Sequence, residues 1–407
     1  MSRVLVLARA IAISAVVSSL LAGCHDSSSA GRSPAAMPDA SGGTGGASGP
    51  APEVDTGTDL NPVPTPERDG ATAPSDTPAP IDSDAGAVPA ADAPVTPPAP
   101  GAAATLVGGL SIQRFRDNIK MVAGFGDRLQ GSSRFDMASA WLDQTLTALG
   151  YTVEHHSYMF QGAPRINTFV TKIGSKSPDR MYIVGAHLDG RGNGGGADDD
   201  GSGVSLVLEV ARAFAPAAVQ TDVSIRFAFW CNEETGMDGA RAYVTDRAAR
   251  QGMEMPPGSH KFPEPHWLGM IQHDMMLYDH GLPPGPTQRV GADINIDYQQ
   301  SSKFAAESKM LADTAAAGAR THAKDYPPIV GNNMAGTDSV PFQDVAPSIS
   351  VREARRVEEI LRGSNPHHHQ PTDVPESYSD LDYRLGFNAL ETTLGTVATL
   401  AGARLGP

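Results

Sequence analysis

Residues 181–214 read MYIVGAHLDGRGNGGGADDDGSGVSLVLEVARAF, and this stretch decides the fold. It starts with a short apolar run, Met181 to Ala186, which is typical of a buried β-strand. A glycine-rich loop with three consecutive aspartates follows, and residues 204–214 then have the apolar spacing of a helix. A strand, a polar loop and a helix in this order indicate an α/β sheet.

The same alternation continues on both sides of this stretch. We expect further helices over 111–124, 134–149, 239–250, 303–317 and 381–400, and strands over 151–158, 167–172, 223–230, 267–275 and 348–351. Strands that alternate with helices predict an α/β sheet with helices on both faces. In such sheets ligands bind beyond the carboxyl ends of the strands, so those ends are where a functional site is expected.

Imidazole and carboxylate side chains recur at the predicted strand ends. They are His187, Asp189, Asp198, Asp199, Asp200, Glu233, Glu234, His273, Asp274, and the run His367-His368-His369 with Asp373. Three adjacent aspartates repel one another unless a cation is present. Imidazole with carboxylate is the donor set that suits zinc or a similar divalent metal. Asp189, two residues after His187, fits a carboxylate that orients a metal-binding imidazole.

Each of these groups also has a plainer interpretation. The three aspartates fit a solvated turn or a calcium loop, and the Glu233-Glu234 pair fits the first turn of a helix, where carboxylates complement the dipole. The three histidines fit a surface loop. The recurrence of such groups at successive strand ends of one sheet nevertheless favours a metal site.

In order and spacing, three segments resemble the co-catalytic di-zinc exopeptidases of the bacterial leucyl aminopeptidase and aminopeptidase Y type. The segments are Gly185–Asp189, Gly196–Gly203 and Glu233–Gly236, and the resemblance covers about residues 110–403. Wider relatives of that family include glutaminyl cyclases. The resemblance implies a mixed, mainly parallel eight-stranded sheet sandwiched between helices, which agrees with the pattern of elements above.

The resemblance also implies a role for individual residues. The ligands of two zinc ions would be His187, Asp199, Glu234, Asp274 and His369. Asp199 would be shared by both metals, and the family often has a cis peptide just after this aspartate. His369 is chosen from the three histidines because it precedes Asp373 by four positions, as in the family. Glu233 would be the general base and acid, and Asp189 would orient His187.

These roles imply an aminopeptidase that acts on a peptide or small amide. The two metals would lower the pKa of a water molecule, and Glu233 would take its proton and return it to the leaving amine. Two alternatives stay open: a glutaminyl cyclase or another zinc amidohydrolase of the same fold, and a non-catalytic surface binding module. One zinc ion per chain would favour the cyclase, whereas five ligand positions favour two ions.

The sequence departs from the family at a few positions. Thr337-Asp338-Ser339 stands where members often have Ser-Asp-His, and His368 stands where some have a substrate-binding residue. We interpret His368 as a candidate oxyanion donor. His273 is interpreted as a packed strand histidine, and Cys231 as a small core residue at a strand end. These departures concern substrate preference more than the metal site.

Residues 1–23 have the features of a bacterial lipoprotein signal peptide. Arg3 and Arg9 precede an apolar run that ends in Leu21-Ala22-Gly23-Cys24, which resembles a lipobox. A lipid on Cys24 would anchor the exported protein to a membrane of the bacterial cell envelope, at the outer membrane or the cell surface. The alternative is an ordinary signal peptide with an incidental cysteine.

The composition changes sharply after the signal peptide. Residues 25–104 contain 15 of the 33 prolines and no Phe, Trp or Tyr, so we expect 24–104 to be a disordered tether and 105–407 to be the catalytic domain. The net charge is −15, from 31 basic and 46 acidic residues. Neither the tether nor the domain has the basic excess that nucleic-acid binding requires, so nucleic acid is not an expected partner.

Overall fold

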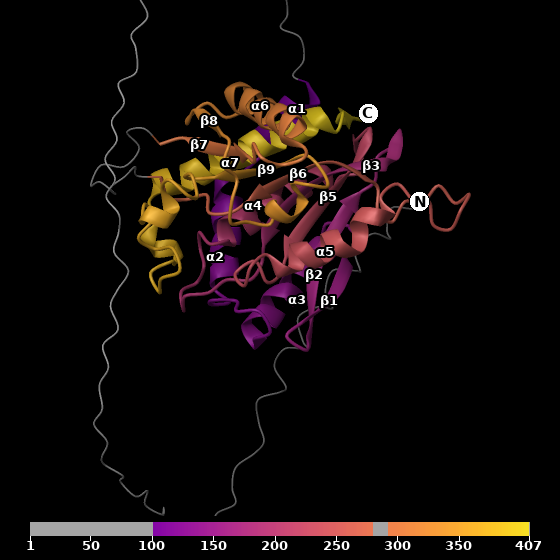
Figure 1. The fold of residues 1–407 in the computed structure, drawn as a ribbon. Helices are drawn as coiled ribbons and strands as arrows, with labels where there is room; N and C mark the ends of the chain where they lie inside the picture. The colour runs from indigo at the N-terminus through magenta and orange to yellow at the C-terminus, as the bar shows by residue number, and fades with distance from the viewer. Residues whose placement is uncertain (1–100, 280–291, 407) are drawn as a thin grey trace, which may run out of the picture. The chain divides into compact units, whose positions relative to one another are not determined.

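The computed structural model of the 407-residue chain describes residues 101–279 and 292–406 (Figure 1). The predicted signal peptide, Cys24 and the tether up to residue 100 lie outside the described residues. The first helix, α1 (Ala102–Gly108), begins three residues before the predicted start of the catalytic domain. In the described part of the chain, no helix combines the length and the apolar character that crossing a membrane requires.

An eight-stranded mixed sheet forms the centre of the fold, in the order β1-β2-β5-β3-β6-β9-β7-β8. The strands are β1 (Glu154–Phe160), β2 (Ala163–Lys172), β3 (Ser177–His187), β5 (Val223–Trp230), β6 (His266–His273), β7 (Ile294–Tyr298), β8 (Pro328–Gly331) and β9 (Ser348–Arg352). The central strands β5, β3, β6 and β9 are parallel, whereas β1, β2 and β7 pair antiparallel with their inner neighbours. The predicted mixed, mainly parallel sheet is confirmed.

Helices cover both faces of this sheet. They are α2 (Ile112–Ala123), α3 (Ser133–Ala148), α4 (Gly201–Phe214), α5 (Asp238–Arg247), α6 (Ala305–His322) and α7 (Asp380–Leu400). Side-chain oxygens of Ser111, Ser132, Asp200 and Ser379 cap the first turns of α2, α3, α4 and α7. All six of these helices were predicted from the sequence, and the predicted ends differ from the observed ends by a few residues. The short helix α1 was not predicted.

Alternation along β3 shows how the sheet separates two hydrophobic clusters. Val184 and Ala186 belong to a large cluster that includes residues of α2, α3, α4, α6 and α7. Met181 and Ile183 belong to a smaller cluster with Tyr243 of α5. Because successive side chains of a strand point to opposite faces, the two clusters lie on opposite faces of the sheet. The sheet is therefore sandwiched between helices, as predicted.

Three parts of the sheet were not predicted correctly. β7 and β8 were not expected, and a two-stranded ribbon of β4 (Val219–Gln220) and β10 (Arg404–Leu405) was not expected either. The strand predicted over 267–275 ends at His273, so Asp274 follows the strand instead of lying within it. This end places the Asp274 carboxylate at the same sheet edge as the other predicted site residues.

Candidate active site

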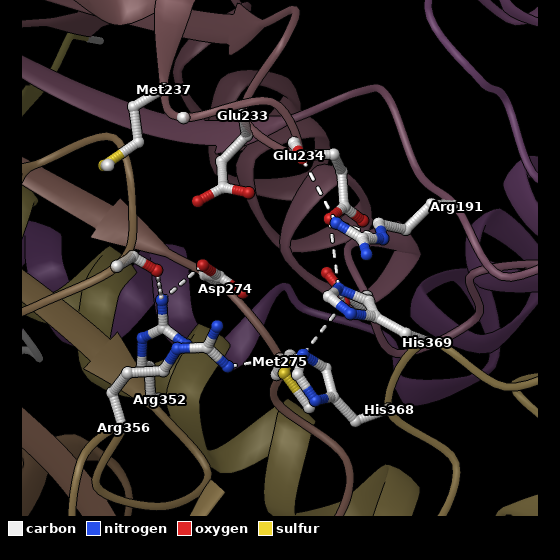
Figure 2. Close-up of a pocket in the computed structure, with 13 residues that line it drawn as sticks. Arg191, Glu233, Glu234, Met237, Asp274, Met275, Arg352, Arg356, His368 and His369 are labelled. Atoms are coloured by element: carbon white, nitrogen blue, oxygen red, sulfur yellow. Dashed lines mark hydrogen bonds and ion pairs between the residues drawn. The ribbon is translucent and has the colours of Figure 1, made fainter. Parts of the chain in front are cut away.

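Neighbouring strand ends bring the predicted site residues together. His187 is the last residue of β3, Asp274 follows β6, and Glu233 and Glu234 follow β5. These three strands are parallel neighbours, so their carboxyl ends meet at one edge of the sheet. Figure 2 shows Glu233, Glu234, Asp274 and His369 around one pocket at this edge.

Asp199 lies between two imidazoles at the centre of this cluster. Its Oδ1 lies 3.2 Å from Nε2 of His187, and its Oδ2 lies 3.1 Å from Nε2 of His369. Nε2 of His187 is also 3.8 Å from Oδ1 of Asp274, and Nε2 of His369 is 3.0 Å from Oε2 of Glu234. The five predicted ligands therefore form one group in which Asp199 touches both histidines. The peptide between Asp199 and Asp200 is cis, as the resemblance implies.

The donor atoms of this cluster fit a divalent metal. His187, Asp199 and Glu234 each offer one donor atom, and these three atoms lie within 4.8 Å of one another. The same is true of one donor atom each of Asp199, His368 and His369. His187 Nε2 and Glu234 Oε1 are buried and have no hydrogen-bond partner in the described part of the chain. A buried polar atom without a partner is costly, and a bound cation would satisfy both atoms. Imidazole nitrogen with carboxylate oxygen is a donor set for zinc.

Asp189 holds this arrangement through two different groups. Its backbone carbonyl lies 2.9 Å from Nδ1 of His187, whereas its carboxylate is 3.9 Å from that nitrogen. The carboxylate instead accepts from the backbone N–H groups of Glu233, at 3.2 Å, and Glu234, at 3.4 Å. Asp189 therefore contacts His187 through its backbone, and its side chain fixes the loop that carries the two glutamates. The sequence-based prediction had assigned the orienting contact to the side chain.

The Glu233 carboxylate points into the pocket beside the predicted ligands (Figure 2). Burial raises its pKa to about 8; His187 acts in the opposite direction, and the Asp274 and Glu234 carboxylates add to the rise. A carboxyl group whose pKa lies near neutrality both accepts and releases a proton readily. The position and the pKa of Glu233 therefore suit general acid–base chemistry.

Comparison with known proteins agrees with this geometry. Residues 168–385, more than half of the chain, match peptidase family M28. The chain belongs to peptidase family M28. Curated relatives of this M28 chain include leupeptin-inactivating enzyme 1 of Streptomyces exfoliatus, which is 31% identical over 126 residues, or 31% of this chain and 28% of the relative. The probable lipoprotein aminopeptidase LpqL of Mycobacterium tuberculosis is 29% identical over 50% of this chain and 39% of its own length. The matched segments thus span less than half of these relatives.

Solved structures show the same M28 fold. The aminopeptidase of Aneurinibacillus sp. strain AM-1 has a TM-score of 0.56 at 15% identity, over 75% of this chain and 97% of that one. Legionella pneumophila LapA aminopeptidase has a TM-score of 0.56 at 16% identity, over 74% of each chain. Porphyromonas gingivalis glutaminyl cyclase has a TM-score of 0.50 at 21% identity, over 72% of this chain and 98% of that one. These likenesses concern the fold.

Arg352 contacts Asp274, a predicted ligand of the M28 site, and was not predicted from the sequence. It is the last residue of β9, it is buried, and its Nη2 forms an ion pair with Oδ2 of Asp274. Burial alone would raise the pKa of Asp274, but the Arg352 guanidinium and the His187 imidazole together outweigh burial and lower the pKa to about 2. Arg352 thereby helps to keep Asp274 ionised. Its signal in the sequence is weak, because one arginine at the end of a short strand is common.

Two further side chains have the structural positions that their sequence context indicates. His273 is fully buried, with Nδ1 3.2 Å from the Gly185 carbonyl and Nε2 2.8 Å from Oγ1 of Thr393. Both ring nitrogens are therefore used within the core. Cys231 is also fully buried, and burial raises the pKa of its thiol, which opposes a role as a nucleophile.

The three aspartates of the glycine-rich loop have separate tasks. Asp198 accepts from the backbone N–H groups of Met276, at 2.7 Å, and Leu277, at 2.8 Å. Asp200 accepts from the N–H of His187 at 3.0 Å and also caps α4. The neighbours of the Asp199 side chain are instead the two histidines of the cluster. Of the three aspartates, Asp199 is therefore the one whose carboxylate lies beside the imidazoles of the cluster.

The loop that carries these aspartates is held by Arg128, which is fully buried. Its Nε donates to the carbonyl of Leu188 at 2.8 Å, Nη2 to that of Gly196 at 3.1 Å, and Nη1 to that of Gly195. The Asp373 carboxylate binds the same loop through the N–H groups of Asp198, at 2.9 Å, and Asp199, at 3.1 Å. Two buried charged groups thus fix the backbone around Asp199.

We expect Arg128→Met to lower the free energy of unfolding by about 3 kcal/mol, because three buried carbonyls lose their donor. Urea denaturation followed by circular dichroism measures the change. Arg134→Met is the matched control: Arg134 is about half exposed and pairs with Asp127, so its loss is expected to cost less than about 1 kcal/mol. Equal losses in the two variants would contradict a structural role for Arg128.

Proposed function

We propose that this protein is a zinc-dependent aminopeptidase that removes N-terminal residues from peptides. The observation that carries the proposal is the cluster of five ligand-type side chains around Asp199, with the Glu233 carboxylate beside it in the same pocket. Membership of peptidase family M28 supports a peptidase, and the similarity to the probable lipoprotein aminopeptidase LpqL supports an aminopeptidase.

In this proposal the residues of the cluster would hold two zinc ions. His187 and Asp274 would hold one ion, Glu234 and His369 would hold the other, and Asp199, which lies near both histidines, would contribute to both. Bound zinc would supply Lewis acidity towards the substrate carbonyl. Arg352 helps to keep Asp274 anionic, and the contact of His187 Nδ1 with the Asp189 carbonyl leaves Nε2 free to bind metal.

Glu233 handles the protons of the reaction. Its carboxylate accepts a proton from the attacking water and delivers it to the amine that leaves. Unlike Asp274 and Glu234, Glu233 forms no ion pair with either histidine of the cluster in the described part of the chain. It is therefore available for this transfer. The cationic α-amine of a peptide is attracted to the acidic side of the pocket, which favours cleavage at the N-terminus.

We also propose that the enzyme is exported and anchored by a lipid on Cys24, with residues 24–104 as the tether between membrane and enzyme. The proposal rests on the signal-peptide features of residues 1–23 and on the composition of the segment after them. LpqL is named a lipoprotein, which supports an envelope location for this chain as well. Metabolic labelling with a palmitate analogue tests the anchor, and a Cys24→Ala variant is expected to lose the label.

Zinc analysis together with peptide hydrolysis tests the enzymatic proposal. We expect two zinc ions per chain and cleavage of leucyl-p-nitroanilide, with activity lost on chelation and restored by zinc. The N-acetylated form of the same substrate is the matched control and is expected to resist cleavage. One zinc ion with cyclisation of N-terminal glutamine would establish the cyclase alternative instead. Equal cleavage of the acetylated substrate would contradict an aminopeptidase.

A further inference from the structure

Cationic as well as acidic side chains line the pocket, although the proposed chemistry relies mainly on the acidic ones. The pocket has a volume of about 180 Å³, and Arg191, Arg352 and Arg356 all line it together with four of the five predicted ligands (Figure 2). Its large apolar lining residues are Met237 and Met275. The polar character of the lining points to a polar substrate group.

Arg352 and Arg356 both pack against the turn at Gly336. The Gly336 carbonyl accepts from Nη2 of Arg352 at 2.7 Å. A Cβ atom at Gly336 would lie 3.0 Å from Nε of Arg356, and the φ angle of +57° also favours glycine. Glycine at this position leaves room for the Arg356 side chain beside the turn. The placement of Arg356 at the pocket is therefore built into the fold.

The three arginines of the pocket differ in how their charges are compensated. Arg352 pairs with Asp274, and Arg191 has its Nε 3.8 Å from Oε2 of Glu234. Arg356 has no carboxylate partner within 4 Å among residues 101–279 and 292–406, and its Nη1 lies 3.3 Å from Nε2 of His368. Its neighbour Arg355, outside the pocket lining, is paired with Glu359. Arg356 is therefore the lining arginine whose charge lacks a partner.

We propose that Arg356 binds a carboxylate of the substrate and makes the enzyme selective for substrates that carry one next to the scissile bond. This inference rests on the proposed function. A guanidinium group binds a carboxylate through two parallel hydrogen bonds. This pairing is stronger when the guanidinium group is partly buried than when it is exposed. The carboxylate is either the side chain of an N-terminal Asp or Glu residue or the free C-terminus of a dipeptide. Both present the same chemistry to Arg356.

Substrate pairs that differ only in this charge test the proposal on the zinc-loaded protein. The first pair is glutamyl- and glutaminyl-p-nitroanilide, and the second is alanyl-alanine and its amide. We expect the wild-type kcat/KM to be about tenfold higher for the charged member of one pair. Arg356→Gln is expected to remove that preference, mainly through a higher KM for the charged member. The pair that responds identifies the source of the carboxylate.

Arg355→Gln is the matched control, because it removes the same charge from the adjacent residue, and we expect it to keep the preference. A wild-type enzyme without preference in either pair, or an Arg356→Gln variant that retains it, would overturn the inference while the aminopeptidase proposal stands. If no substrate is hydrolysed, the proposed function fails instead. Calorimetry with glutamate and glutamine then tests Arg356 without turnover, and equal binding of the two would overturn the inference.

Discussion

Replacing Glu233 with glutamine is expected to lower kcat by about 10³-fold, because the variant keeps the shape of the side chain but loses its capacity to accept a proton. Glu233 faces the pocket, and its surroundings raise its pKa to about 8. In the described part of the chain it forms no ion pair with His187 or His369, whereas Asp274 and Glu234 do. Zinc content should therefore stay unchanged while turnover falls. Steady-state kinetics with leucyl-p-nitroanilide and zinc analysis of the same samples measure both quantities.

Two further glutamate variants frame this experiment. Glu234→Gln is expected to lose zinc, because Oε2 of Glu234 lies 3.0 Å from Nε2 of the predicted ligand His369. Glu358→Gln removes a half-buried carboxylate that does not line the pocket, and it should leave kcat unchanged. Retention of kcat within tenfold in Glu233→Gln would exclude this residue as the general base. Loss of zinc in that variant would instead assign Glu233 to metal binding.

The site residues at the strand ends could be predicted from the sequence for two reasons. Apolar runs mark the strands, and parallel strands of an α/β sheet end at the same edge, where ligands bind. Apolar runs predict β3 and β5, and polar residues directly after them must lie at the edge where parallel strands end. His187, Glu233 and Glu234 were located by this argument. The choice of Asp199 from three aspartates, and of His369 from three histidines, depended on resemblance to a family. The structure gives the physical reason for Asp199, since the other two aspartates hold backbone N–H groups.

Other features depend on contacts that no local pattern encodes. Arg352 and Arg356 lie in a run of mixed charges, and such a run ordinarily indicates a solvent-exposed segment. Pairing of β9 with β6 brings Arg352 to Asp274, and the turn at Gly336 then brings Arg356 to the pocket. β7 and β8 are five and four residues long, too short for a periodic signal. Arg128 lies outside any predicted element, although it holds the loop of the site.

Zinc is expected to raise the melting temperature of the metal-free protein by about 10 °C when its concentration is far above the dissociation constant, since it binds the folded state. The physical reason is the set of buried carboxylates around Asp199. Burial raises the pKa of Glu233 to about 8 and that of Glu234 to about 7, which shows that their charged forms are unfavourable in the protein without metal. A divalent cation among them reverses this penalty.

A pair of histidine variants separates this effect from zinc bound elsewhere. His187→Ala removes a buried ligand whose Nε2 has no hydrogen-bond partner in the described part of the chain, and we expect it to lose most of the zinc-induced shift. His155→Ala removes a partly exposed imidazole of β1 that pairs with Asp143, and it should keep the shift. Differential scanning calorimetry with and without zinc measures both variants. A zinc-induced shift of equal size in His187→Ala would mean that the stabilising zinc binds outside the cluster. The substitution removes Nε2 of His187, and an ion that uses this nitrogen as a ligand would bind more weakly without it.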